Sequence, residues 1–291
     1  MPLKQRISLK DLSAVAASRT VIINCPIGPR YHYINIAHGY ASGTNTIAAA
    51  ATNIAEVRLK LNNRVQWKLT GTQLRDRNLL NGTAFDAVAG EVPNTAPGVS
   101  FPLFFAEPWR KDIATQDALA MPTGGGFIKT CQIEIDLGAA STPTIQAWAM
   151  VDSVVFDKAQ MIKKVLPQGI NAGGTKFDFT LNEQDGFLTQ ISLYPDSGGS
   201  NALTPVTLRK GGLILHELTG AMNKALLTQS QMTPAASGRT ANIYDIILDS
   251  DDTIGSALPL DSSRDVSLTI EAGGAMSGTI TAIVERIGFP E

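Results

Sequence analysis

Residues 57–71 read VRLKLNNRVQWKLTG, and residues 206–220 read VTLRKGGLILHELTG. The two stretches align without a gap, and both end in a Leu-Thr-Gly triplet. Two unrelated hairpins can look alike by chance, but a gapless match that runs into the same triplet is typical of an internal duplication. We therefore interpret the chain as two copies of one structural unit.

Each copy has the pattern of a β-hairpin followed by a helical turn. In the first copy, apolar residues alternate over 57–61 and again over 65–69, as they do in half-buried strands. Asn62-Asn63 separates the two runs, and a Gly-Gly pair takes its place in the second copy. Both pairs suit the two positive φ angles of a type I′ turn. A short helical stretch follows the triplet in each copy.

Length and composition narrow the class of protein. The chain has 291 residues, which is enough for two domains of ordinary size. Its content of 44% hydrophobic and 17% charged residues excludes a disordered chain and indicates that much surface is hidden in cores or against neighbours. The net charge of −2 lacks the basic excess of a general nucleic-acid binder, so we expect no direct, sequence-specific contact with nucleic acid.

The two cysteines and the N-terminus indicate where the protein is made. Cys25 and Cys131 lie in apolar, strand-like runs, which favours reduced core thiols over a disulfide. Residues 1–18 lack the continuous apolar region of a signal peptide. No run reaches the roughly 18–20 apolar residues that a membrane-spanning helix needs. We expect a protein that is made in a reducing cytoplasm and kept soluble.

Short alternating apolar runs continue through both halves of the chain. The first half opens on SRTVIINC (18–25) and closes on two alternating runs (131–137 and 144–151); the second half repeats this order and closes on DVSLTIEA (265–272) and SGTITAIVERI (277–287). Long helical patterns do not alternate with the strands, which disfavours an α/β fold. The pattern predicts an all-β protein of two tandem eight-stranded jelly rolls with short helices in the loops. A single large barrel would not explain the repeat.

Composition also suggests the domain boundaries. A stretch of mixed character over residues 152–170 ends in Pro167 and Gly169 and reads as a bridge between the halves. The predicted parts are an N-terminal arm over 1–14, a first jelly roll over 15–155, and a linker with the second jelly roll over 156–291.

The N-terminal arm is basic. Lys4, Arg6 and Lys10 stand against a single acid, Asp11. Such a segment is either a solvated, frayed terminus or a tether to an acidic surface such as lipid head groups.

An acidic loop is the best metal candidate in the sequence. Asp249, Asp251 and Asp252 lie within four residues, and Ca²⁺ prefers several oxygens from a flexible loop. The spacing is not that of an EF-hand, so a solvated loop is the competing interpretation. If Ca²⁺ binds here, the missing oxygens would come from another subunit.

Catalytic motifs are scarce. His32, His38 and His216 are scattered, and neither HExxH nor GxSxG occurs. His216 aligns with Trp67 in the duplicated hairpin, which is typical of a packing position. We therefore expect a protein that is not an enzyme; a cupin-like site would need clustered histidine and carboxylate ligands.

One tryptophan stands apart from the strand patterns. Trp67 and Trp148 fall in alternating runs and are expected in the core, whereas Trp109 follows a proline in a loop. An exposed tryptophan is typical of an interface, so Trp109 is our candidate interface residue.

Several stretches together carry a resemblance to a known family. AVAASRTVIINCPIGPRYHYINI (14–36) has a strand, then PIG, then an aromatic-rich strand; VRLKLNNRVQW leads into a helix rich in Leu and Arg; FPLFFAEPW leads on to CQIEIDL. In this plan, which the second half repeats, the chain resembles the double jelly-roll major capsid proteins of lipid-containing icosahedral bacteriophages, and most of all the corticovirus type. Longer loops over 39–53 and 81–98 depart from the family.

The resemblance implies a structural role in a virion. Three chains would form a pseudo-hexagonal capsomer, and capsomers would tile an icosahedral shell around an internal membrane. The implied partners are further copies of the chain, penton and minor membrane-associated capsid proteins, and the inner lipid membrane, with Lys4, Arg6 and Lys10 directed towards acidic head groups. The family can bind Ca²⁺ between subunits. We expect the loops over 81–98 and 195–204 at the outer end of the capsomer.

A different class of function stays open beside this one. A jelly-roll glycan- or receptor-binding spike protein would also have two β-domains, and it would use an exposed Trp109 to stack on a sugar.

Overall fold

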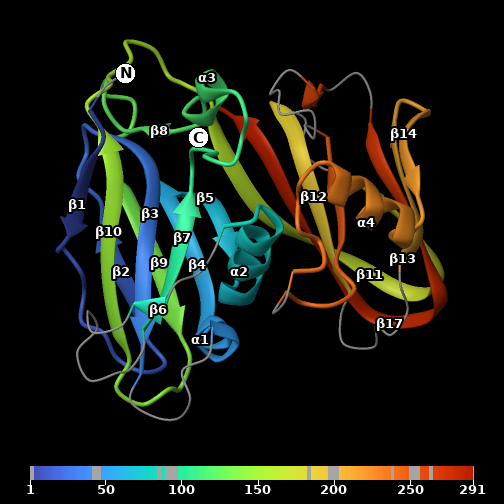
Figure 1. The fold of residues 1–291 in the computed structure, drawn as a ribbon, viewed down its shortest axis with the longest axis horizontal. Helices are drawn as coiled ribbons and strands as arrows, with labels where there is room; N and C mark the ends of the chain where they lie inside the picture. The colour runs from blue at the N-terminus through green and yellow to red at the C-terminus, as the bar shows by residue number, and fades with distance from the viewer. Residues whose placement is uncertain are drawn as a thin grey trace. The chain divides into compact units, whose positions relative to one another are not determined.

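The computed structural model describes residues 3–40, 47–83, 87–88, 98–181, 185–195, 203–236, 239–248, 256–261 and 265–290 (Figure 1). The chain divides into two compact units. Unit 1 comprises Met1–Lys163 with Phe289–Glu291, and unit 2 comprises Lys164–Gly288. Strands dominate both units and short helices lie between them, which confirms the predicted all-β fold of two domains.

Unit 1 is built from two antiparallel sheets. One has the strand order β1-β10-β3-β7-β6, with β8 also paired to β3, and the other has the order β5-β4-β9-β2. The strands are β1 (Gln5–Leu9), β2 (Thr20–Asn24), β3 (Arg30–Gly39), β4 (Ile54–Leu61), β5 (Arg64–Leu69), β6 (Ala87–Val88), β7 (Gly98–Phe104), β8 (Met121–Pro122), β9 (Cys131–Leu137) and β10 (Thr144–Asp152). The helices are α1 (Ile47–Asn53), α2 (Gly71–Leu80) and α3 (Ile113–Gln116).

Unit 2 repeats this plan with fewer breaks. One sheet has the order β14-β13-β17-β11, and in the other β12 pairs with β15, β16 and β17. The elements are β11 (Ile162–Thr180), β12 (Phe187–Pro195), β13 (Leu203–Lys210), β14 (Leu213–Leu218), α4 (Gly220–Gln229), β15 (Tyr244–Ile247), β16 (Leu258–Pro259) and β17 (Val266–Gly288).

Strand β17 serves both sheets of unit 2. Its first part pairs with β13 and its last part pairs with β12. The prediction of two separate strands, over 265–272 and 277–287, was therefore wrong, because the 23 residues of β17 form one continuous strand. The glycines and the serine between the two runs resemble a turn signal, but such small residues also let a strand bend sharply at the corner of a sandwich.

The predicted N-terminal arm over residues 1–14 is largely part of unit 1. Gln5–Leu9 form β1, which pairs antiparallel with β10, and Leu12 bridges Ile23. Only Leu9 of this strand is buried, at 2% exposure. A five-residue strand with a single buried position is too short to show a period, which is why the sequence pattern suggested a free arm.

The predicted bridge over 152–170 is also shorter than expected. Strand β11 begins at Ile162, and the first unit ends one residue later, at Lys163. Lys163 and Lys164 gave the stretch its mixed character, yet they are 2% and 1% exposed. A lysine seldom lies at a buried strand position, so composition misplaced the start of the strand.

Alternating side chains form the core of each unit. In β9, Ile133 and Ile135 are 0% exposed, whereas Glu134 between them is half-buried. Cys25 and Cys131 are both buried and free, which confirms their prediction as core thiols. The hydrogen bond with Cys25, together with burial, holds the pKa of the Cys131 thiol well above its ordinary value.

The duplicated stretches form the same local structure. The turn residues Asn62 and Asn63 have φ angles of 50° and 65°, and Gly211 and Gly212 have 54° and 85°, as predicted for type I′ hairpins. Both hairpins also contain a β-bulge, between Leu59 and Lys60 in one copy and at the aligned positions in the other. A bulge at the same place in both copies supports a common origin of the two hairpins.

Threonine of the repeated triplet caps the helix in both copies. The Thr70 side chain accepts a hydrogen bond from the Gln73 backbone N–H, and the Thr70 backbone N–H donates one to the side-chain Oε1 of Gln73. Thr219 accepts from Met222 in the same way. The caps satisfy backbone donors that have no partner within the helix, and they start both helices at the glycine that follows.

The glycine of the triplet differs in its surroundings between the units. A Cβ on Gly71 would clash with the Ala51 carbonyl and lie 2.7 Å from the Ile54 Cβ, whereas a Cβ on Gly220 would meet only the Leu203 carbonyl, at 3.3 Å. We expect Gly71→Ala to lower the free energy of unfolding by about 1–3 kcal/mol through overpacking. Gly220→Ala, the matched control, should change it by less than about 0.5 kcal/mol. Urea denaturation checks both, and equal effects would contradict the packing difference.

Candidate functional site

The basic residues near the N-terminus lie along one extended segment. Lys4, Arg6 and Lys10 are all exposed; Arg6 lies on β1, and Lys4 and Lys10 directly flank this strand. The Lys4 ammonium also forms an ion pair with Asp117, at 2.9 Å. Arg6 and Lys10 are therefore the better placed of the three to meet an acidic partner.

A buried histidine joins the loop residue Asp117, the ion-pair partner of Lys4, to the end of β10. His32 on β3 is 3% exposed and lies between two carboxylates: its Nδ1 is 3.0 Å from Asp117, and its Nε2 is 2.8 Å from Asp152. Arg30 also binds Asp152, at 2.6 Å. Burial alone would raise the pKa of Asp152, but the hydrogen bond from Arg30 and further contacts hold it at about 2. The sequence pattern did not reveal this network, because its members are far apart in the chain.

Trp109 covers a second buried network. Its ring stands perpendicular to Phe104, with 5.5 Å between centroids, and the Lys163 ammonium lies 5.6 Å from its centroid. Lys163 forms an ion pair of 2.6 Å with Glu107, which also binds Arg110. Burial opposes ionisation of Glu107, yet the two cations lower its pKa to about 2. Trp109 is half-buried, so part of its ring is committed to this packing.

The candidate metal ligands Asp249, Asp251 and Asp252 lie outside the described residues. Within the described part of the chain, no group of three or more His, Cys, Asp or Glu side chains is placed to hold a metal ion. The same part contains no helix with the length and apolar character to cross a membrane.

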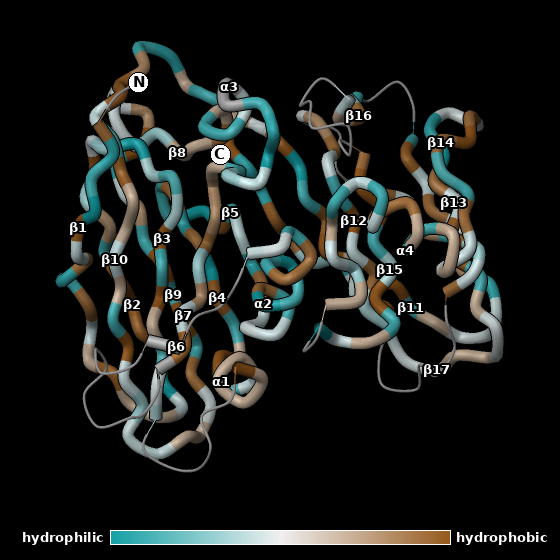
Figure 2. The backbone as a smooth tube through the Cα atoms, in the orientation of Figure 1, coloured by the Kyte–Doolittle hydropathy of each residue, from teal (hydrophilic) through white to brown (hydrophobic). Residues whose placement is uncertain are grey.

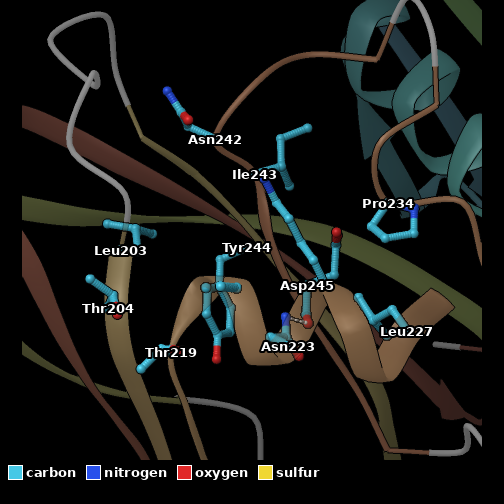
Figure 3. A pocket seen from close by; sticks show the side chains of 13 residues that line it. Leu203, Thr204, Thr219, Asn223, Leu227, Pro234, Asn242, Ile243, Tyr244 and Asp245 are labelled. Atoms are coloured by element: carbon cyan, nitrogen blue, oxygen red, sulfur yellow. Dashed lines mark hydrogen bonds between the residues drawn. The ribbon is translucent and has the colours of Figure 1, made fainter. Parts of the chain in front are cut away.

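Unit 2 contains a pocket of about 400 Å³ beside α4 (Figure 3). Leu203, Leu227 and Ile243 contribute apolar walls. The carboxylate of Asp245, another lining residue, accepts from Arg239 at 2.7 Å and from the Ser192 hydroxyl at 2.7 Å. The Asn223 amide donates to the Asp245 backbone carbonyl at 2.6 Å, as Figure 3 shows. The bonds from Arg239 and Ser192 fix the Asp245 side chain, and the bond from Asn223 ties α4 to β15.

The clearest surface feature lies on the second copy of the duplicated element. Five large apolar side chains of β14 and α4 are exposed, and we call them the unit 2 apolar surface: Leu213 (64%), Ile214 (46%), Leu215 (38%), Met222 (61%) and Leu226 (43%). Strand β14 also lies at the end of the strand order in its sheet. An apolar edge strand beside an apolar helix is typical of an association surface. The sequence pattern located the hairpin but not its exposure.

Two family models match the chain. The model described as viral coat protein P2 N-terminal domain matches residues 6–153, and the model described as viral coat protein P2 C-terminal domain matches residues 162–289. Together they span nearly the whole chain and divide it close to the boundary between the two units.

Solved structures of the same fold extend this likeness. The major capsid protein P2 from Bacteriophage PM2 is 19% identical with a TM-score of 0.80, covering 99% of this chain and 98% of that one. The STIV MCP is 11% identical with a TM-score of 0.68, covering 99% and 97%, and the Faustovirus major capsid protein is 8% identical with a TM-score of 0.60, covering 100% and 91%. No curated protein matches the sequence. At these identities the structural likeness shows the fold.

The low pKa of Asp152 predicts how unit 1 responds to acid. A carboxyl with a folded pKa of about 2, against an ordinary value of 3.8, stabilises the fold above pH 4, and this contribution is lost as the pH falls from about 4 to 2. We expect Asp152→Asn to lower the free energy of unfolding by about 2 kcal/mol at neutral pH, with the difference from wild type shrinking towards pH 2. Urea denaturation across this pH range checks it.

The exposed residue Asp157 provides the matched control for that series. Asp157→Asn should change the free energy of unfolding by less than about 0.5 kcal/mol at neutral pH, because the side chain is exposed. A difference between Asp152→Asn and wild type that stays constant down to pH 2 would contradict the assignment.

Proposed function

The chain belongs to the viral coat protein P2 family, and on that premise we propose that it is the major capsid protein of a virus and assembles as a homotrimer. The observation that carries the proposal is the match of both domain models to the two units of one chain. The fold likeness to capsid proteins along the full chain supports it.

The internal duplication supports the trimer. Two units that share a hairpin, a bulge and a capped helix are similar enough to take nearly equivalent positions in one ring. Three chains would then contribute six such units, which gives a capsomer of pseudo-hexagonal outline. Such capsomers can tile an icosahedral shell, in which the chain's principal partners are its own copies.

The basic segment suggests how the shell meets an internal membrane. Arg6 on the edge strand β1 and Lys10 directly after it are both exposed, so both can approach acidic lipid head groups or membrane-associated capsid proteins. Each basic residue near an anionic bilayer contributes roughly 1 kcal/mol of attraction. A shell lined by membrane also explains why a capsid protein can have a net charge of −2, since it does not contact the genome.

The glycan-binding alternative has less support. It required an exposed Trp109, whereas this ring is half-buried and packs on Phe104 and Lys163. Less of the ring face is therefore left to stack on a sugar.

The native mass of the purified chain tests the proposed assembly. We expect native mass spectrometry to give three times the 30.9 kDa of one chain. A stable single chain at micromolar concentration would overturn the trimer.

The membrane contact is tested separately from the trimer. We expect Arg6→Gln with Lys10→Gln to lose binding to vesicles that contain anionic lipid, by roughly 1 kcal/mol per residue, while the mass stays that of the wild type. Co-sedimentation with vesicles at low and high salt measures the loss. The control pair Lys129→Gln with Lys158→Gln removes the same charge from other exposed positions. Equal losses in both pairs would show a general charge effect and refute the assignment to this segment.

A further inference from the structure

The unit 2 apolar surface concentrates the exposed apolar side chains of the protein. Among the described residues, ten large hydrophobic side chains are exposed, and half of them lie on β14 and α4. Figure 2 shows the apolar stretch at the start of β14 next to the hydrophilic end of β13. Burial of this surface would remove an unfavourable contact with water, so among the described residues it is a good candidate for an association site.

The same element has the opposite character in unit 1. Gln66 and Arg77 are 1% and 5% exposed there, and they align with Leu215 and Leu226, which are 38% and 43% exposed. Unit 1 thus hides polar side chains on this element, whereas unit 2 exposes apolar ones. Solvent alone favours the reverse, which indicates that the surface in unit 2 is covered when the protein functions.

The apolar residues lie on two adjoining elements of unit 2, because only Thr219 separates β14 from α4. Met222 and Leu226 are four residues apart on α4 and therefore lie on the same face of the helix. Leu213, Ile214 and Leu215 are consecutive on β14, and all three are exposed beside the bulge of that hairpin. In unit 1 the aligned helix and strand are in contact, since the Arg77 guanidinium lies 5.2 Å from the centroid of the Trp67 ring.

We propose that the unit 2 apolar surface packs against unit 1 of a second copy of this chain. The inference rests on the proposed trimer and names the surface that holds it together. Gln66 and Arg77, on the hairpin and helix of unit 1, are already buried in the single chain. The aligned Leu215 and Leu226 of unit 2 are exposed, so they are the side chains that a second copy has to cover. Such a contact joins two different surfaces of neighbouring copies. It gives a closed ring if the rotation from one copy to the next divides a full turn, and in the proposed trimer the ring closes after three copies.

Lysine substitutions on the surface test whether it holds the copies together. We expect Leu215→Lys with Leu226→Lys to convert the trimer to single chains at concentrations where the wild type is fully trimeric. Both side chains are already partly exposed, so the fold should be retained, and the circular dichroism spectrum and thermal unfolding of the separated chain check this. A variant that remains as trimeric as the wild type overturns the proposal.

A matched variant on the same helix controls for added charge. Thr228 is exposed on α4 but points to a different side from Leu226, because two residues correspond to about 200° of helix rotation. Thr228→Lys should therefore remain trimeric. Dissociation of this control to the same extent would show that charge on α4 alone disrupts assembly, and it would overturn the assignment to the apolar surface.

Cross-linking identifies the surface that covers it. A photoreactive group attached at Leu213→Cys, in a mixture of ¹⁴N- and ¹⁵N-labelled copies, should form links between differently labelled chains that map to residues 3–163. Links to unit 2 of the second copy would show a symmetric contact and overturn the proposal. A wild type that is monomeric would refute the proposed trimer itself, which distinguishes that failure from a trimer held by another surface.

Discussion

In each unit, consecutive strand segments pair first in one sheet of the sandwich and then in the other. The packing of the core depends on this crossing between the sheets. In unit 1, β9 pairs with β2 and β4, and the next strand, β10, pairs with β1 and β3. In unit 2, β17 does both without a break. Because side chains alternate between the two faces of a strand, a shift of one residue along this path would expose the apolar positions of both sheets. The pairings that surround it are therefore closely constrained.

The duplicated hairpin and helix show how one backbone can serve two different surfaces. Turn, bulge and helix cap are the same in both copies, because they depend on backbone geometry and a few local side chains. The other side chains of the hairpin and helix are free of that constraint. They are polar and buried at Gln66 and Arg77 in unit 1, and apolar and exposed at the aligned positions in unit 2. This difference distinguishes the two units of the chain, and it is the reason why the proposed subunit contact lies on unit 2.

The predictable parts of the candidate site were those with a local pattern. The positive φ angles at Asn62 and Asn63 followed from the two-residue turn between alternating runs. The network of His32 with Asp117 and Asp152 could not be found in this way, because it joins residues more than eighty positions apart. The same holds for Trp109, whose half-burial depends on Lys163 from the start of β11. Buried lysines break the pattern of a strand, and only a partner such as Glu107 makes their burial tolerable.

The sequence by itself determined the all-β class, the duplication, the hairpins, the helices that follow them and the reduced state of the two core cysteines. Each of these depends on contacts or preferences within a few residues, or on a period that repeats along the chain. Only the tertiary structure decided that Gln5–Leu9 form an edge strand, that β17 is continuous, and that Leu213 and Met222 face outward. The physical reason is that exposure and strand pairing depend on which distant segment lies alongside, and an apolar residue in an alternating run has the same local pattern whether its face is covered or open.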